Sequence, residues 1–370
     1  MYILGYNCST AAGFGVNPLM QALYSGTDCS VVAKPGGGRV CFLEGRNLEA
    51  KGYQKKLSQE INSLWIQLTN NLSESDQQSL KNTKIGLIFA STKGCLEDYI
   101  WNAQSDQLAA LDPYAPLVND FVNINIKYDW ALNCTVSNAC SSATVALEYI
   151  DQIFKMDRYE YVLLVSFDLV GPFIYNGFDA LRVLTHTKNK PFAADRDGLQ
   201  LGEAVSLILL CQKKMSEFEI TAVTSETEGA LITKPSKNGL GLIKALEQGS
   251  NRQPDLVIAH GTGTLFNDST EDMALEKFLH QKNIPVTGTK WCIGHSLGAS
   301  GAVDLIAGCE ILKNKKPFHI HNVTAADPEL KMNYLTSNKG HVFKKINTIL
   351  LTTLGFGGVH GALTLSTAKK

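Results

Sequence analysis

The sequence predicts an α/β protein whose strands are covered by helices on both faces. Two observations lead to this fold class: segments of strand length alternate with helical patterns, and most of the strand-length segments are near-continuous apolar runs. Strands buried on both faces have this composition, whereas half-exposed strands alternate apolar and polar residues. A chain of 370 residues with 44% hydrophobic content also suffices for a large core and two or three domain-sized units.

The predicted elements follow one another along the whole chain. The expected strands are IGLIFA (85–90), YVLLVSF (161–167), AVSLILL (204–210), DLVIAH (255–260), TILLTTL (348–354) and ALTLS (362–366). Apolar residues on one helical face predict a helix around 57–68, and further helices are expected at 141–154, 271–280 and 299–312. Asp268 or Ser269 is expected to cap the third of these helices. A polar tract at 213–219 predicts a boundary between two halves, 1–215 and 216–370.

Charge and cysteine content exclude several classes of protein. The chain carries 34 basic and 35 acidic residues, so nothing predicts nucleic acid or an anionic membrane as a partner. Nine cysteines without regular spacing favour free thiols in a reduced cytoplasm over a disulfide framework, and the cysteine pairs of a zinc site are absent. The first residues, MYILGYNCSTAAG, do not predict a signal peptide, and no apolar run approaches the roughly 20 residues of a membrane span.

Three reactive side chains lie in separate motifs rich in small residues. Cys140 lies in SNACSSAT, His260 in HGTGTLFND and His295 in GTKWCIGHSLGASGA. A lone buried cysteine or histidine is more often structural than catalytic, and the glycines of HGTGT are also compatible with a simple tight turn. One cysteine and two histidines on Gly-rich turns together favour acyl transfer through a thioester.

Cys140 directly precedes the predicted helix at 141–154. The positive end of the helix dipole and the free N–H groups there are expected to lower the pKa of its thiol. The same N–H groups can form an oxyanion hole, and the small residues around the sulfur allow an acyl chain to approach. His260 ends a predicted strand, His295 precedes a small-residue helix, and Lys290 lies five residues before His295. These positions predict side chains that face a cleft.

At these motifs the sequence resembles the β-ketoacyl-acyl-carrier-protein synthases, the decarboxylating condensing enzymes of the thiolase superfamily. The resemblance is to the branch with one cysteine and two histidines, which includes fatty-acid elongation enzymes and polyketide ketosynthases. It covers nearly the whole chain in the family's order: NACSSA (138–143), KPFAADRDGLQLGEA (190–204), HGTGTLFNDSTE (260–271), TKWCIGHSLGASGAVD (289–304) and LGFGGVHGALTL (354–365).

The resemblance implies a thiolase-like fold. Two similar βαβαβαββ-type halves would form a five-layered αβαβα unit, usually a dimer, with the nucleophile in the first half and both histidines and the lysine in the second. The implied partners are acyl- and malonyl-loaded acyl carrier protein and either a second copy or another ketosynthase-like chain. The resemblance implies neither a cofactor nor a metal.

The resemblance also implies residue roles. Cys140 would accept the acyl chain, and His260 and His295 would promote decarboxylation and stabilise the enolate and the thioester oxyanion. Lys290 would orient the histidines, and Glu271 would support the site through water or a bound cation. Phe356 and Gly357, in the Gly-rich GFGG loop, would form a gate beside Cys140.

Departures from the family pattern concentrate around the gate and the pocket. The usual Pro after HGTGT is Leu265, and the usual Gly-Glu-Gly-Ala-Gly is GEAVS. The Asn-Ser-Phe before GFGG is replaced by Thr352-Thr353-Leu354, and the Thr-Asn after it by Val359-His360. These changes bear on substrate and gating more than on the chemistry.

Three functions compete. The leading hypothesis is a decarboxylative Claisen condensation through acyl-Cys140, in fatty-acid or polyketide chain elongation. The second is a chain-length-factor-like partner subunit with little or no condensing activity of its own, although such subunits usually lack the cysteine. The third, a thiolase using coenzyme A, would need a second catalytic cysteine near the C-terminus, and the last cysteine here is Cys309.

Overall fold

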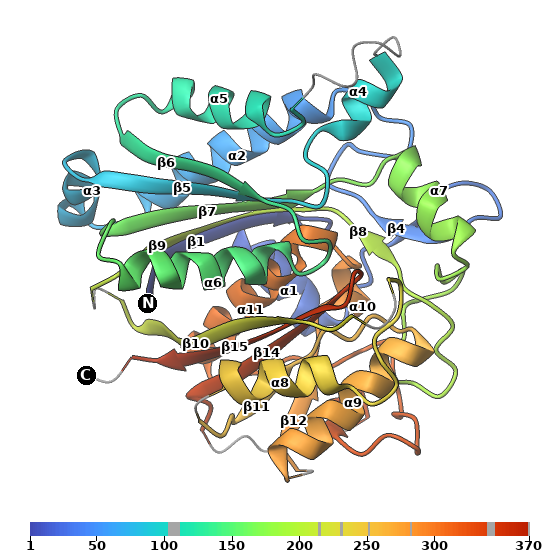
Figure 1. The fold of residues 1–370 in the computed structure, drawn as a ribbon. Helices are drawn as coiled ribbons and strands as arrows, with labels where there is room; N and C mark the ends of the chain where they lie inside the picture. The colour runs from blue at the N-terminus through green and yellow to red at the C-terminus, as the bar shows by residue number, and fades with distance from the viewer. Residues whose placement is uncertain are drawn as a thin grey trace.

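The computed structural model describes residues 1–102, 112–213, 216–229, 232–250, 252–281, 283–338 and 345–368. Two sets of five strands dominate it, and both sets have the same order (Figure 1). The first runs β1-β9-β7-β5-β6, with bounds Tyr2–Thr10, Ala204–Cys211, Tyr161–Asp168, Lys84–Ala90 and Asp129–Val136. The second runs β10-β15-β14-β11-β12, with bounds Phe218–Thr227, Val359–Thr367, Thr348–Gly355, Leu256–Ile258 and Pro285–Thr287.

Strand directions repeat as well. In each set the first two pairings are antiparallel and the last two are parallel. A single antiparallel pairing, Tyr2 with Glu219, joins β1 to β10, and β13 (Asn333–Tyr334) extends the second set beside β12. The two halves therefore share one βαβαβαββ arrangement, which the sequence alone did not establish.

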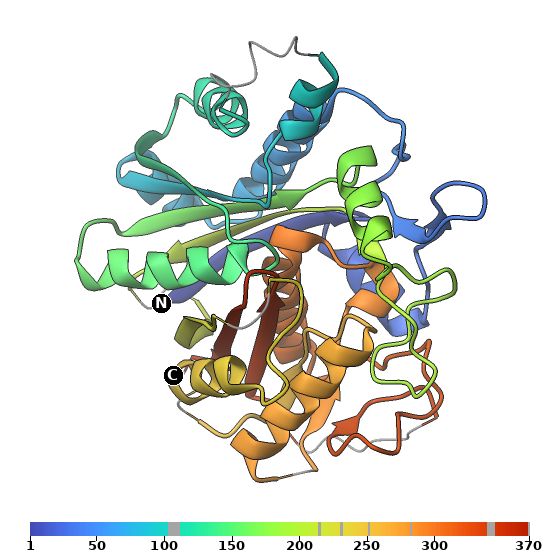
Figure 2. The same cartoon turned by 45° about the vertical axis from the view of Figure 1, so that its right-hand side comes forward.

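The helices complete five layers (Figures 1 and 2). Helices α2 (Tyr53–Asn70) and α5 (Ala115–Ile124) cover the outer face of the first set, and α8 (Leu240–Gly249) and α9 (Leu265–Leu279) cover that of the second. Between the sets lie α1 (Val16–Ser25), α6 (Ser142–Lys155) and α11 (Ser300–Asn314), and α6 and α11 contact strands of both. The predicted thiolase-like αβαβα fold is confirmed.

Shorter elements surround this framework. Strands β3 (Val31–Val32), β4 (Arg39–Cys41) and β8 (Leu201–Gly202) form a small sheet, and β2 (Gly13–Phe14) pairs with β1. The remaining helices are α3 (Glu74–Lys81), α4 (Leu96–Asn102), α7 (Pro172–Ala180), α10 (Lys290–Ile293) and a 3-10 turn at Leu297–Ala299.

All six predicted strands are present, but two details of the helices differ from the prediction. Helix α6 begins at Ser142, so Cys140 lies one residue before the capping position of Ser141. Helix α9 begins at Leu265 after Thr264, so the predicted cap at Asp268 or Ser269 is wrong. The Asp268 carboxylate instead accepts the N–H groups of Phe192 and Gly263, which fixes the turn that follows His260. The predicted boundary at 215 adjoins residues outside the described ranges; β9 ends at Cys211 and β10 begins at Phe218.

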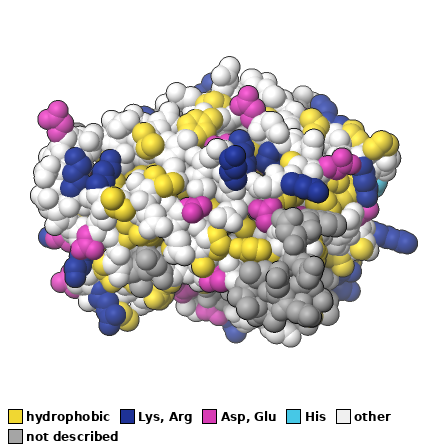
Figure 3. Space-filling model, turned by 90° about the horizontal axis from the view of Figure 1, so that it is seen from above, with side chains coloured by type: hydrophobic (Ala, Val, Ile, Leu, Met, Phe, Trp, Pro, Cys, Tyr) yellow, Lys and Arg dark blue, Asp and Glu magenta, His cyan; other side chains and the backbone are white. Residues whose placement is uncertain are grey.

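The outer surface over α2 and α5 carries basic and acidic side chains interspersed with apolar ones, without a large field of one sign (Figure 3). This agrees with the net charge of −1. Among the described helices, none combines the length and apolar character needed to cross a membrane.

Candidate active site

A tight turn between β6 and α6 presents Cys140. Ala139 adopts the left-handed region at φ 43°, which is uncommon for a residue with a side chain. Ser142 fixes the turn, because its Oγ donates to the Ala139 carbonyl at 2.7 Å and accepts the Asn138 N–H at 2.8 Å. The Ser141 hydroxyl donates to the Val359 carbonyl at 2.9 Å, which ties the nucleophile turn to the GFGG loop.

His295 contacts the nucleophile directly: its Nε2 lies 3.0 Å from Cys140 Sγ. The preceding Gly294 has φ 69°, and a Cβ there would lie 2.5 Å from the Leu201 carbonyl oxygen, so only glycine fits. The N–H of His295 donates to the Gln200 carbonyl and its own carbonyl accepts the N–H of Gly202. The strand β8 region therefore holds His295 in place.

His260 follows β11, and its ring lies 5.1 Å from that of His295, centroid to centroid, at an interplanar angle of 88°. Glu271 on α9 holds its backbone, accepting the N–H groups of His260 at 2.7 Å and Gly261 at 2.8 Å. Thr352 also donates its hydroxyl to this carboxylate. Glu271 therefore supports the site by direct hydrogen bonds. Burial raises its pKa to about 7, although these hydrogen bonds act in the opposite direction.

Lys290 is fully buried behind the histidines and pairs with Asp304 of α11, with 2.9 Å between Nζ and Oδ2. The Thr289 hydroxyl donates to the other oxygen of this carboxylate. Sequence reasoning missed Asp304, although an acid inside the otherwise apolar run GAVDLIAG was a usable signal. A buried acid of this kind needs a charged partner.

Burial keeps the reactive groups neutral. It raises the pKa of the Cys140 thiol to about 12, while an N–H from Phe356, the Lys290 charge and the N–H of Cys140 itself act to lower it. Burial, aided by the Lys290 charge, lowers the pKa of His295 to about 3 and that of His260 well below its usual range. The expected low thiol pKa is wrong for the free protein, because the helix end does not outweigh desolvation. The geometry thus places a neutral thiol against a neutral imidazole.

Alkylation of Cys140 by iodoacetamide is expected to accelerate about tenfold per pH unit between about pH 7 and about pH 10, without levelling off. The thiolate is the reactive form, and with a pKa of about 12 its fraction still grows over this whole range. An ordinary thiol, with a pKa of about 8.5, levels off above about pH 9. Peptide mapping of the alkylated protein measures the rate at Cys140 alone. A plateau already near pH 7 would mean a thiolate–imidazolium pair.

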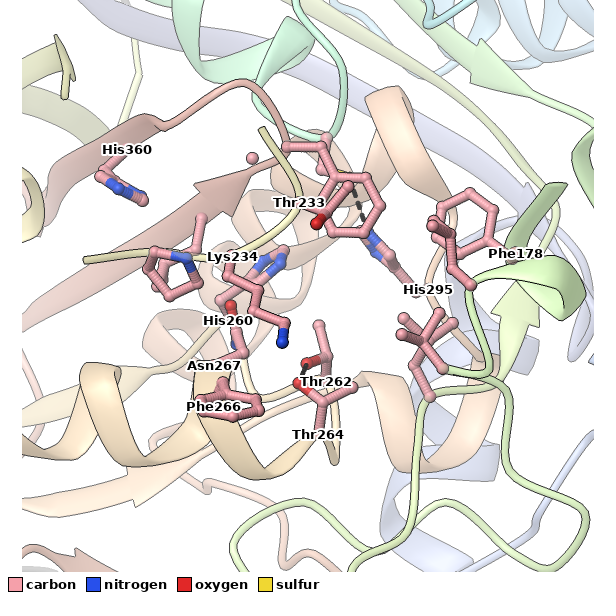
Figure 4. Close-up of a pocket in the computed structure, with 18 residues that line it drawn as sticks. Phe178, Thr233, Lys234, His260, Thr262, Thr264, Phe266, Asn267, His295 and His360 are labelled. Carbon is pink, nitrogen blue, oxygen red and sulfur yellow. Dashed lines mark hydrogen bonds between the residues drawn. The ribbon is translucent and has the colours of Figure 1, made fainter. Parts of the chain in front are cut away.

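Cys140, His260 and His295 line one cavity of about 120 Å³ (Figure 4). Phe356 also lines it and stacks on Phe178 of α7, with 5.5 Å between ring centroids and 14° between planes. Gly357 lies outside the cavity wall and donates its N–H to the Ile232 carbonyl at 2.6 Å. Within the described residues, no cluster of three or more His, Cys, Asp or Glu side chains is arranged to hold a metal ion.

The cavity also contains residues that sequence reasoning missed. Phe178, Lys234 and His360 all line it. His360 occupies one of the positions that depart from the family pattern, and its Nε2 lies 3.1 Å from a carboxylate oxygen of Glu228. Phe178 and Lys234 lie outside the motifs in the sequence, whereas His360 lies within LGFGGVHGALTL and gave a signal as a departure from the family pattern.

Close packing of small residues sets the spacing between the nucleophile and the histidines. A Cβ on Gly301 of α11 would lie 2.9 Å from the Thr144 hydroxyl of α6, and one on Gly361 of β15 would lie 2.5 Å from a Thr144 methyl group. A Cβ on Gly355 would lie 2.8 Å from the Ser141 hydroxyl. Larger side chains would force α6 away from α11 and β15.

Two domains known from other proteins match most of this chain. Residues 71–216 match the β-ketoacyl synthase N-terminal domain, and residues 217–324 match the β-ketoacyl synthase C-terminal domain. The chain is 28% identical over 269 residues to 3-oxoacyl-[acyl-carrier-protein] synthase 2 of Synechocystis, covering 66% of this chain and 63% of that protein. It is 27% identical over 257 residues to the ketoacyl synthase alpha subunit of the tetracenomycin polyketide synthase of Streptomyces glaucescens, covering 64% and 60%. These alignments thus span somewhat less than two thirds of both relatives.

Among solved structures, the chain resembles a chain of the complex between the ketosynthase ApeO and its chain length factor ApeC, from Xenorhabdus doucetiae. The TM-score is 0.80 at 21% identity, over 99% of this chain and 98% of that chain. This likeness establishes the shared fold, and the two domain matches cover most of the sequence. The chain belongs to the β-ketoacyl synthase family.

Proposed function

We propose that the protein is a β-ketoacyl-acyl-carrier-protein synthase, an acyltransferase that condenses an acyl group on Cys140 with a malonyl group on acyl carrier protein. The observation that carries this proposal is the 3.0 Å contact between Cys140 Sγ and His295 Nε2, with His260 at right angles beside it. A thiol, an adjacent base and a second imidazole in one cavity are the groups that thioester transfer and carbanion formation require.

In the first step, the acyl group moves to the enzyme. His295 accepts the thiol proton as the sulfur attacks the thioester carbonyl, and the carrier thiol leaves with that proton. The N–H groups of Cys140 and Phe356, which approach the sulfur, would stabilise the oxyanion. Because His295 is a weak base, proton transfer is coupled to the attack rather than preceding it.

In the second step, malonyl thioester loses CO₂ and its carbanion attacks acyl-Cys140. The new carbon–carbon bond forms as the bond from the carbonyl to Sγ breaks, and the released Cys140 thiolate takes up a proton from water through His295. His260 and His295 would donate hydrogen bonds to the malonyl thioester oxygen as charge builds there. The Lys290–Asp304 pair would hold both imidazoles neutral, so that each keeps a lone pair and an N–H.

We infer that residues 1–215 and 216–370 act as two halves with a shared site. The first half supplies Cys140, and the second supplies His260, His295 and Lys290. Neither half would be active alone, because the decisive contact joins Cys140 to His295 across the middle layer.

Partners form part of the proposal. The names of the relatives support acyl carrier protein as the substrate carrier. The ApeO–ApeC complex supports pairing with a second ketosynthase-like chain, either another copy or a different subunit. Among the residues that the structure describes, strand β6 ends the first strand set and pairs with β5 alone, which leaves its other side for a second chain.

The complex with a chain length factor also favours a second candidate function, in which this chain shapes the pocket of a partner ketosynthase. The departures from the family pattern around Phe356 also favour this second function. The contact between Cys140 and His295 favours the catalytic subunit, since a partner without condensing activity has no need of it.

One assay tests the proposal. The wild-type protein is incubated with acyl-loaded carrier proteins of different chain length, with and without malonyl carrier protein and candidate partner subunits. Intact-mass analysis is expected to show an acyl adduct that disappears when malonyl carrier protein is added, together with a β-ketoacyl carrier protein two carbons longer. If no acyl donor modifies the protein under any of these conditions, the catalytic proposal is wrong.

A further inference from the structure

Lys234 places a cation on the wall of the active-site cavity. Its Nζ lies 4.4 Å from the centroid of the Phe266 ring, and both residues line the cavity. The ammonium group points into the cavity between His260 and Thr262 (Figure 4). In the part of the chain that the structure describes, no carboxylate lies within salt-bridge distance of it. The cation is therefore held by an aromatic face and available to an anion.

The segment that carries Lys234 is fastened over the cavity at several points. Glu228 accepts the N–H and hydroxyl of Ser236 at 2.6 and 2.7 Å, and the N–H of Gly241 at 3.0 Å. Burial opposes ionisation of Glu228, but the Ser236 bonds and the nearby His360 outweigh it and lower its pKa to about 2. The bond from Gly357 N–H to the Ile232 carbonyl ties the segment to the GFGG loop. Lys234 is therefore an exposed residue at the rim of the cavity, in a segment that hydrogen bonds on both sides of it hold in place.

The other ionisable groups of the site leave an anion without a counter-charge. Cys140, His260 and His295 are neutral at pH 7, because burial raises the pKa of the thiol and lowers the pKa values of the imidazoles. Lys290 is buried behind the histidines and paired with Asp304. His360 also lines the cavity, but its Nε2 faces Glu228, 3.1 Å from a carboxylate oxygen. A carboxylate that entered this largely apolar cavity would lose its water, at a substantial cost unless a cation met it.

We propose that Lys234 is a specificity-determining residue that binds the free carboxylate of the malonyl extender unit. This inference rests on the proposed condensing function, in which one substrate carries that carboxylate and the other, the acyl starter, carries none. The carboxylate leaves as neutral CO₂, so the ion pair exists before the carbon–carbon bond forms and not in the later steps. An ion pair kept until the carboxylate leaves is made about equally with the bound substrate and in the transition state for decarboxylation, and such an interaction acts on KM rather than on kcat.

The test separates the two half-reactions and uses pantetheine thioesters, which carry no phosphate. Lys234→Met is expected to leave acylation of Cys140 by a neutral acyl-pantetheine within about twofold of wild type. The same variant is expected to raise KM for malonyl-pantetheine by about tenfold or more, with kcat nearly unchanged, since a hydrogen bond to a charged group is lost. Lys234→Arg should keep KM for malonyl-pantetheine close to the wild-type value because arginine retains the positive charge. Lys237→Met, on the same segment but outside the cavity wall, serves as the matched control.

Each other outcome has a distinct meaning. An equal loss in both half-reactions would place Lys234 against the pantetheine arm and overturn the proposal. An unchanged KM for malonyl-pantetheine would make it an ordinary surface lysine. If wild-type protein fails to condense any acyl group with malonyl thioester, the proposed function fails instead, independently of the Lys234 variants.

Discussion

Replacement of Cys140 by alanine is expected to abolish acylation and condensation. The thiol is the only nucleophile that His295 contacts in the cavity within the described residues, at 3.0 Å, and alanine has no group that can carry an acyl chain. Intact-mass analysis after incubation with acyl carrier protein should show the adduct for wild type and the unmodified mass for Cys140→Ala. Thermal unfolding should change little, because the substitution removes one atom beside an existing cavity.

Two variants control this result. Cys134→Ala removes a partly buried cysteine of β6, six residues away in sequence, and is expected to be acylated like wild type. Cys140→Ser keeps the geometry with a poorer nucleophile and should lose most of the rate. An acyl adduct that persists in Cys140→Ala would place the nucleophile elsewhere and contradict the proposed site.

Substitution of His260 by alanine is expected to slow condensation by about two to four orders of magnitude while leaving acylation of Cys140 nearly intact. His260 lies beside His295, but only His295 contacts the sulfur. Replacing His260 should therefore affect condensation alone, whereas replacing His295 should affect acylation as well. His295→Ala should therefore impair both steps. Single-turnover acylation and β-ketoacyl formation, measured separately for each variant, give the comparison.

A conservative variant distinguishes chemistry from folding. His260→Gln retains a neutral side-chain donor and should recover part of the condensation rate lost in His260→Ala, provided that its amide reaches the same position. Circular dichroism and unfolding curves of both variants should match wild type. If His260→Ala slows acylation as much as condensation, the assignment of His260 to the condensation step alone is wrong.

The strand framework was largely predictable from sequence because strands covered on both faces, parallel or antiparallel, are continuous apolar runs. The segments at 85–90, 161–167 and 204–210 all became buried strands. The start of α9 was not predictable from capping preferences alone. Aspartate is a residue type that often caps helices. The Asp268 carboxylate instead accepts the N–H groups of Phe192, which lies far from it in sequence, and of Gly263.

Site residues that lie in local sequence motifs were predictable. Site residues that reach the cavity only through tertiary packing were not. His260 and His295 stand on recognisable Gly-rich turns, Cys140 lies in a small-residue motif, and Lys290 lies five residues before His295. Phe178 and Lys234 come from segments without a motif and reach the cavity only through tertiary packing. The thiol pKa was mispredicted because a sequence displays the helix that follows Cys140 but not the depth at which the sulfur is buried.

The close approach of Gly301 and Gly361 to Thr144 has a consequence for how this protein can diverge. These two glycines let α6, which follows the nucleophile, pack closely against α11 and β15, and an added methyl group at either position would require Thr144 to shift. The segment around Lys234 belongs to the rim and is attached by a few hydrogen bonds. A substitution in the segment around Lys234 therefore need not move the nucleophile turn, whereas a side chain at Gly301 or Gly361 would press on α6.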